Sequence, residues 1–300
     1  MEIREKEIFK VTAVGSVVNV LLTVFKFVAG IAGRSAAMTA DAIHSLSDLV
    51  TDALVLVFVH ISSKPADKGH EYGHGKFETI ASALIGMALM AVAGGIFFNA
   101  ADDVVGFFHG RPLPAPGPLA LWAAVVSILL KEAVYRFTAF KGRRLDSPAL
   151  EANAWHHRSD ALSSVGTLVG IGGAILLGGR WAILDPLASA AVACFIAAMA
   201  WRLLRDSFDE LTEASLPREV EKEILDIVST FPDVSDPHNL RTRRIGNHFA
   251  IELHIRMDGG LSLLEAHSRA HYLENALKER FGPETHVIVH VEPVKPFPKY

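Results

Sequence analysis

Six long apolar stretches follow one another through the first 206 residues, and none follows them. Each is close to the ~20 residues that an α-helix needs to cross the hydrocarbon core of a bilayer. They lie at about residues 8–31, 36–60, 77–98, 119–140, 148–178 and 186–205. Only 21% of the residues are charged, against about 25% in a soluble protein. Residues 1–206 are therefore expected to form an all-α six-helix transmembrane bundle in a lipid bilayer.

Basic residues distinguish the two ends of these segments. The segment before the first stretch and two of the connections carry three basic residues each, whereas the other three connections carry one arginine each. The richer set is Arg4, Lys6, Lys10, Lys64, Lys68, Lys76, Lys141, Arg143 and Arg144. Positive charge accumulates on the cytoplasmic side, so both termini are expected in the cytoplasm.

Residues 207–300 differ in charge and in pattern. They hold 11 Lys and Arg against 16 Asp and Glu, net −5, while residues 1–206 hold 18 against 17, net +1. Periodicity predicts helices and strands in the order α-β-β-α-β, typical of a small α+β, metallochaperone-like domain. The expected elements are a helix at 217–230, strands at 241–244 and 249–257, a helix at 262–281 and a strand at 287–291. We expect this domain to be cytoplasmic, and its acidity argues against nucleic acid as a partner.

Local signals predict how some helices begin and pack. Asp146-Ser147-Pro148 and Asp185-Pro186 each offer a capping side chain and a first-turn proline, for the fifth and sixth spans respectively. Gly166 and Gly170, four residues apart, offer a small face for close helix packing.

Two spans repeat one polar motif where lipid would otherwise be expected. The second contains His44-x-x-x-Asp48 and the fifth contains His156-x-x-x-Asp160. Asp41 and Asp52 extend the stripe of the second span. A charged side chain within a membrane helix costs at least ~2.5–3.5 kcal/mol, so a repeated pattern of this kind predicts a functional site. The structural alternative is a set of interhelical hydrogen bonds or ion pairs that only hold the bundle together.

The charge of the four motif residues favours a divalent cation. Two aspartates and two neutral histidines total −2, and four N/O ligands suit tetrahedral zinc. Without metal, the two buried carboxylates favour protonation, so metal and protons would compete for one site, as antiport requires. The only cysteine, Cys194, cannot form an intrachain disulfide or a multi-thiolate zinc site.

The paired motifs, the six spans and the α+β tail together resemble the cation diffusion facilitator family, and most closely its bacterial zinc/proton antiporters. The resemblance implies a homodimer in which each protomer carries its own transport site, here His44, Asp48, His156 and Asp160. It also implies a second zinc site in the loop after the second span. The residues that match it are Asp67, His70 and His74; on spacing alone they could equally be solvated loop side chains.

The tail also matches the family, through residues 236–243 and 289–293. The resemblance implies a regulatory dimer domain with a zinc site, and the matching positions are His238, His254, His267, His290 and Glu292. Seven of the fourteen histidines lie in these last 94 residues. Lys76 and Glu213 resemble a charge pair found at the family's dimer interface.

The expected function is therefore Zn²⁺ export from the cytoplasm across the plasma (inner) membrane in exchange for protons, regulated by metal binding to the tail. Iron(II), manganese and cobalt are alternative cargoes, because all accept N/O ligands. A membrane-anchored metal sensor or scaffold is a second hypothesis. An enzyme is not expected, because neither a His-Glu-x-x-His nor a Gly-x-Ser-x-Gly motif occurs.

Overall fold

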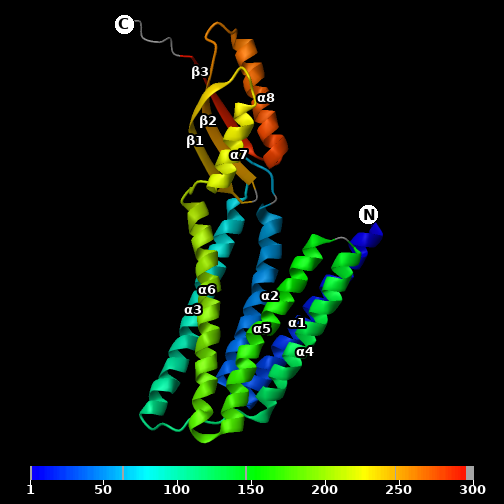
Figure 1. Cartoon of the computed structure of the whole chain (residues 1–300), viewed down its shortest axis with the longest axis vertical. Coiled ribbons are helices and arrows are strands. Elements are labelled where there is room, and N and C mark those ends of the chain that lie inside the picture. The colour runs from blue at the N-terminus through cyan, green and yellow to red at the C-terminus, as the bar shows by residue number, and fades with distance from the viewer. Residues whose placement is uncertain (1, 63, 146, 247, 295–300) are drawn as a thin grey trace. The chain divides into compact units, whose positions relative to one another are not determined.

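The computed structural model describes residues 2–62, 64–145, 147–246 and 248–294 (Figure 1). Side chains at 2–6, 8, 9, 52, 54–57, 59, 60, 148, 149 and 152 also lie outside the description. Six long helices come first, with a short 3₁₀ helix, η1 (Gly179–Ile183), before the last. They are α1 (Glu2–Ala32), α2 (Ala36–Ser62), α3 (Lys76–Phe108), α4 (Pro118–Arg144), α5 (Pro148–Leu177) and α6 (Leu184–Leu211).

The internal contacts divide the chain into two compact units. The first contains Met1–Leu54 and Ile85–Arg202, and the second contains Val55–Leu84 and Leu203–Tyr300. Helices α2, α3 and α6 each contribute to both units. The functional boundary expected after residue 206 stays a prediction.

The helices are long and apolar enough to span a membrane. Five segments of the described chain meet this condition, at Lys10–Ala32, Lys76–Phe108, Pro118–Arg144, Asn153–Leu177 and Gly179–Leu211. Leucine and valine side chains point outward from them, for example Leu21 on α1 and Leu162 on α5, as expected of surfaces that face lipid. The sixth long helix, α2, is not among the five, and much of its second half has side chains outside the description.

Small residues allow α5 and α6 to approach closely. They are not the predicted pair of Gly166 and Gly170. A Cβ on Gly170 would lie 2.3 Å from the Cβ of Ala188, and one on Gly173 would lie 2.5 Å from Leu184 Cδ1. A Cβ on Gly166 would meet nothing within 4 Å. The packing face is therefore Gly170 with Gly173, and the assignment of Gly166 to it was wrong, because no neighbouring atom of the described chain lies close to a Cβ placed on Gly166.

One of the two predicted caps is confirmed. Ser147 precedes α5, with Pro148 at its start, and its hydroxyl accepts the Leu150 N–H; Asp146 lies outside the described residues. Asp185 was expected to cap α6, but α6 already begins at Leu184. Its carboxylate instead accepts the Ser35 hydroxyl and the Ala36 N–H, both at 2.6 Å. Asp185 thus caps α2 across the bundle, where free N–H groups attract negative charge.

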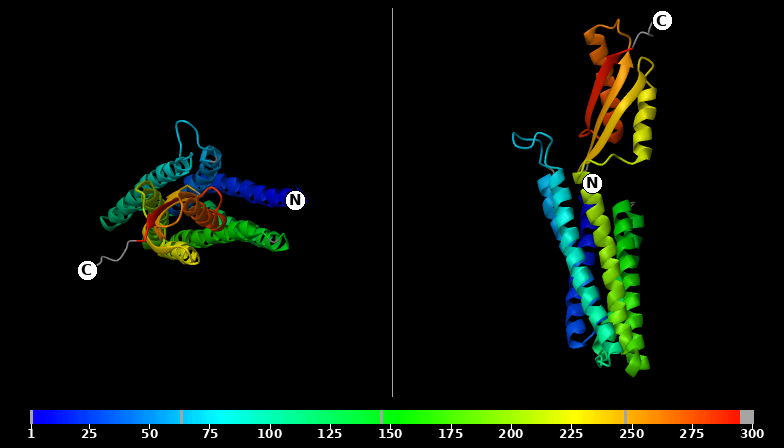
Figure 2. Two further views of the ribbon diagram at one scale, coloured as in Figure 1. Left: turned by 90° about the horizontal axis from the view of Figure 1, so that it is seen from above. Right: turned by 90° about the vertical axis from the view of Figure 1, so that its left-hand side faces the viewer.

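The tail has the predicted α-β-β-α-β order (Figure 2). Its elements are α7 (Arg218–Ser229), β1 (Ser235–Ile245), β2 (His248–Met257), α8 (Leu263–Phe281) and β3 (His286–Pro293). The sheet order is β1-β2-β3, with β1 antiparallel and β3 parallel to β2. Strand β1 begins six residues earlier than predicted, because irregularities in its pairing near His238 interrupt the alternation of side chains.

One face of the sheet supplies the core of the tail. Odd-numbered residues of β2 from Ile251 to Met257 are buried together with α7 and α8 side chains, among them Ile224 and Leu273. Even-numbered residues of β2 therefore point to the other face of the sheet. That alternation sets His254 opposite the core.

The two α5 glycines provide a matched test of this packing. Gly170→Ala should destabilise the protein by about 1–3 kcal/mol, since its new methyl group would force α5 and α6 apart. Gly166→Ala should be neutral or stabilising by about 0.5–1 kcal/mol, because it meets open space and removes glycine's helix penalty. Thermal unfolding of the detergent-purified protein would measure both, and equal effects would contradict the assigned face.

Candidate metal sites

Three ionisable side chains meet inside the helical unit. His44 and Asp48 come from α2 and Asp160 comes from α5, and one ligand atom from each lies within 4.8 Å of the others. His44 Nε2 is 3.9 Å from Asp48 Oδ2, and the His44 ring rests edge-on against Phe195 of α6 at 5.6 Å. We refer to His44, Asp48 and Asp160 as the interior cluster. It unites three of the four residues expected at a transport site.

The fourth expected ligand lies at the edge of this cluster. His156 Nε2 is 3.9 Å from Asp160 Oδ2, but the His156 side chain is 47% exposed. The neighbouring His157 is buried and its Nε2 has no hydrogen-bond partner among the described residues. Asp52, the last residue of the predicted stripe, has a side chain outside the described residues.

One carboxylate oxygen of the interior cluster is available to accept a hydrogen bond or to bind a metal ion. Asp48 Oδ2 is buried and has no hydrogen-bond partner among the described residues. Buried polar atoms are rarely left unpaired, because losing water without a replacement costs free energy. An imidazole and two carboxylates around such an atom are suitable ligands for a divalent transition-metal ion.

Two buried lysines, which the sequence reading missed, pair with interior aspartates. Lys131 of α4 donates to Asp160 Oδ2 at 2.8 Å, and Lys26 of α1 lies 2.7 Å from Asp41 Oδ2. The Lys26 ammonium also donates to the hydroxyls of Ser45 and Ser164, at 3.1 and 3.2 Å. The available signal was the presence of Lys26 and Lys131 within two of the predicted spans, since a charge in a membrane helix needs a partner.

These lysines change the charge inside the bundle. Asp41, Asp48 and Asp160 supply three negative charges, and the two lysines supply two positive charges. Asp41 is neutralised by Lys26, so it belongs to an ion pair that joins α1 to α2 rather than to the interior cluster. The sum of −2 that favoured a divalent ion therefore omitted Lys131, whose charge is already at Asp160.

The loop between α2 and α3 brings together a second group. Asp67 Oδ1 lies 3.5 Å from His70 Nδ1 and Asp67 Oδ2 lies 3.5 Å from His74 Nε2. The backbone N–H groups of Gly69 and His70 donate to Oδ1. These hydrogen bonds hold the pKa of Asp67 below its usual range, so the carboxylate stays ionised at neutral pH. The three predicted loop residues thus share one turn.

A third group lies on the sheet face opposite the tail's core. His254 Nδ1 is 3.2 Å from Glu292 Oε1, and His238 Nε2 is 3.5 Å from Glu292 Oε2. The strands align His238 with His254 and His254 with His290, so the histidines form one row across the sheet. The hydrogen bond to His254 is the main reason that the pKa of Glu292 is lowered. The Glu292 side chain, which is longer than that of an aspartate, reaches the imidazoles of both His238 and His254.

Two predicted tail residues are placed differently. The His290 ring lies 4.5 Å from the His254 ring, but no ligand atom of His290 joins the group formed by His238, His254 and Glu292. His267 lies on α8, where its ring stacks on His271 at 6.3 Å. Within one chain, α8 covers the core face of the sheet. His267 therefore does not lie near His238, His254 and Glu292, which we call the His238 group.

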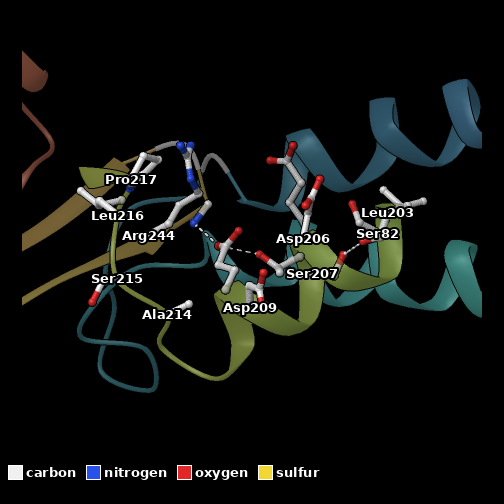
Figure 3. Close-up of a pocket in the computed structure, with 14 residues that line it drawn as sticks. Ser82, Leu203, Asp206, Ser207, Asp209, Ala214, Ser215, Leu216, Pro217 and Arg244 are labelled. Carbon is white, nitrogen blue, oxygen red and sulfur yellow. Dashed lines mark hydrogen bonds between the residues drawn. The ribbon is translucent and has the colours of Figure 1, made fainter. Parts of the chain in front are cut away.

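Lys76 and Glu213 are in contact within the second unit. Arg243 Nε also lies 3.0 Å from Glu213 Oε2, and this ion pair ties the end of β1 to the segment after α6. Nearby, Glu210 accepts both the Thr79 hydroxyl and the Gly246 N–H. A cavity of about 610 Å³ adjoins these contacts. Figure 3 shows Asp206 and Asp209 of α6 and Arg244 of β1 along it.

Comparison with known families agrees with this architecture. A model described as the cation efflux transmembrane domain matches residues 12–212, and one described as the cation efflux protein cytoplasmic domain matches residues 216–294. The chain belongs to the cation diffusion facilitator family. It is accordingly an integral membrane protein that exports divalent metal cations.

Individual relatives are similar over nearly the whole chain. Metal tolerance protein C1 of Arabidopsis thaliana is 35% identical over 95% of this chain, which spans 62% of that protein's length. The manganese efflux system protein MneP of Bacillus subtilis is 32% identical over 97% of both chains. The metal-bound C-terminal domain of the CzcD transporter from Thermotoga maritima is 29% identical, covering 27% of this chain and 99% of that one, with a TM-score of 0.25.

Two Glu–His contacts in the tail allow a controlled test of the His238 group. Glu292→Gln should weaken zinc binding about tenfold or more, because it removes the carboxylate that joins two imidazoles. Glu274→Gln is the control, since Glu274 lies 3.5 Å from His271 outside any three-residue group. The zinc-dependent rise in unfolding temperature of the full chain reports the affinity. An equal rise in both variants would contradict the site.

Proposed function

We propose that this protein is a homodimeric Zn²⁺/H⁺ antiporter that exports zinc from the cytoplasm across the plasma membrane through the interior cluster. The observation that carries the proposal is the meeting of His44, Asp48 and Asp160 within membrane-spanning helices, where a buried carboxylate oxygen has no partner among the residues that the structure describes. Such an arrangement has little structural benefit, because an unpaired buried charge destabilises a bundle. A cargo ion that binds there and leaves accounts for it.

The choice of zinc rests on imidazole. His44 supplies one nitrogen, and His156 lies 3.9 Å from Asp160 Oδ2, close enough to complete the four ligands that tetrahedral zinc takes once its side chain turns inward. The exposure of His156 is consistent with a ligand that joins the site from an aqueous opening. Alternating access would then expose the interior cluster first to one side of the membrane and then to the other.

Proton coupling follows from the carboxylates. A metal ion requires Asp48 to be ionised, while in the metal-free site its buried charge, unpaired among the described residues, favours proton uptake. The competition converts a proton gradient into a metal gradient when each state opens to one side. The basic residues Lys64, Lys68, Lys76, Lys141, Arg143 and Arg144 support cytoplasmic termini.

The tail and the loop supply sites for regulation. Two groups each hold two imidazoles and a carboxylate, the ligand types that bind zinc. They are His238, His254 and Glu292 in the tail, and Asp67, His70 and His74 in the loop. Zinc at the tail would favour one arrangement of the dimer and shift the population of transporting states. The contact between Lys76 and Glu213 would link the tail to the start of α3 during that shift.

Manganese is the second candidate cargo. The interior cluster has two carboxylates and one imidazole, and oxygen ligands suit manganese better than zinc. The name of the Bacillus subtilis relative, which matches over 97% of its length, also specifies manganese. The role of His156 distinguishes the two cargoes.

Replacing Asp48 tests the transport site. Asp48→Asn should reduce zinc uptake driven by an acidic lumen into proteoliposomes to background, because the unpaired carboxylate is lost. Asp102→Asn is the matched control, as its carboxylate pairs with Arg111 at an exposed position of α3, and it should transport normally. Unchanged uptake in Asp48→Asn would refute the site. Zinc binding without flux in the unmodified protein would instead favour a sensor or scaffold.

Replacing His156 tests the cargo. If zinc uses four ligands, His156→Ala should lower zinc affinity by about tenfold or more while manganese affinity changes little. His109→Ala is the control, because His109 is exposed just after α3 and the hydrogen bond described for its ring is to Val105 O. Competition between the two metals in proteoliposomes would measure the selectivity. An equal loss for both metals would contradict a zinc-specific role for His156.

A further inference from the structure

One of the three residues of the interior cluster, Asp160, is paired with Lys131. Lys131 Nζ lies 2.8 Å from Asp160 Oδ2, with the two side chains only 3% and 6% exposed. Asp160 Oδ2 is also the atom that faces His156 Nε2. The oxygen expected to bind cargo is therefore already bound to a positive charge supplied by α4.

Cargo and this ammonium are electrostatically incompatible. A zinc ion lies ~2.0–2.2 Å from a carboxylate oxygen. An ion on Asp160 Oδ2 would therefore lie within about 5 Å of the ammonium in its present position. In a bundle interior, where water is scarce, a charge of +2 and a charge of +1 at that distance repel strongly. Binding at the cluster thus requires the lysine to move.

We propose that Lys131 is a tethered cation that neutralises Asp160 when the cluster holds no metal and is displaced when the metal binds. This inference rests on the proposed transport site. It makes Lys131 a determinant of affinity, since every binding event must break an ion pair. It also provides positive charge at the carboxylates during the step in which the empty site returns across the membrane.

The contacts of the two buried lysines support this division of roles. Lys26 has three partners, in Asp41, Ser45 and Ser164, which fix it between α1, α2 and α5. Among the described residues, the Lys131 ammonium donates to Asp160 alone. Lys26 is thus firmly held, while Lys131 is released by breaking one contact.

The displaced ammonium has an acceptor nearby. Ser127 precedes Lys131 by one helical turn on α4, and its buried hydroxyl has no hydrogen-bond partner among the described residues. Side chains on a helix lean toward its N-terminus, so the Ser127 hydroxyl lies on the side toward which the Lys131 side chain can turn. The movement can therefore take place without leaving the ammonium unpaired.

Zinc binding and transport by Lys131→Met provide the test. Methionine keeps the apolar length of the side chain but lacks the charge, so zinc affinity should rise about tenfold or more. In proteoliposomes, KM should fall and the maximal rate should also fall, because the empty return step loses its counter-charge. A purely structural role predicts weaker binding. Unchanged or weaker binding would overturn the inference.

A second measurement uses the unmodified protein and does not depend on the variant folding. Reductive methylation followed by peptide mass spectrometry compares labelling of Lys131 with and without zinc, with Lys26 as the internal reference. Zinc should raise labelling of Lys131 several-fold and leave Lys26 unchanged. Equal labelling of Lys131 in both conditions would overturn the inference.

Asp48→Asn separates this inference from the proposed site. If the zinc binding assigned to the interior cluster persists in Asp48→Asn, the site itself is refuted. If Asp48→Asn removes that binding while Lys131→Met fails to tighten it, the site stands and the tethered cation is refuted.

Discussion

The cost of an uncompensated charge in an apolar environment governs the interior of this protein. Each buried aspartate of the helical unit must be paired, neutralised or bound to a cation. Lys26 satisfies Asp41 and Lys131 satisfies Asp160, each from a different helix. Asp48 Oδ2 has no such partner among the described residues. The unpaired Asp48 oxygen therefore marks the position of the interior cluster. It also explains why this cluster needs a proton or a metal ion.

The same requirement explains what the sequence could predict. Helix-length apolar runs, the repeated His-x-x-x-Asp motifs and the order of elements in the tail are local patterns, and they predicted the spans, the α+β fold and the residues of the interior cluster. Lys26 and Lys131 were missed because neither belongs to a repeated motif, and the partner of each lies on a helix that only packing brings near. Asp185 was assigned to its own helix for the same reason, although it caps α2.

The remaining differences arise from side-chain direction. Spacing placed Gly166 with Gly170, yet Gly170 and Gly173 are the two glycines that meet α6 side chains closely. In the tail, spacing could not reveal that irregular pairing in β1 brings His238 into register with His254. Nor could it show that His267 would lie on a helix covering the other face of the sheet. Residue type predicted the chemistry of these sites, and tertiary packing decided which residues meet.

The central claim is that cargo binds at the interior cluster in place of the pairing that otherwise neutralises it. Anomalous diffraction at the zinc edge from crystals of the full chain grown with zinc would locate the ion directly. The account predicts a peak bonded to His44, Asp48 and Asp160, with the Lys131 ammonium turned away from Asp160. Crystals with zinc at the tail but none among these helices, and with the Lys131–Asp160 pair intact, would contradict it.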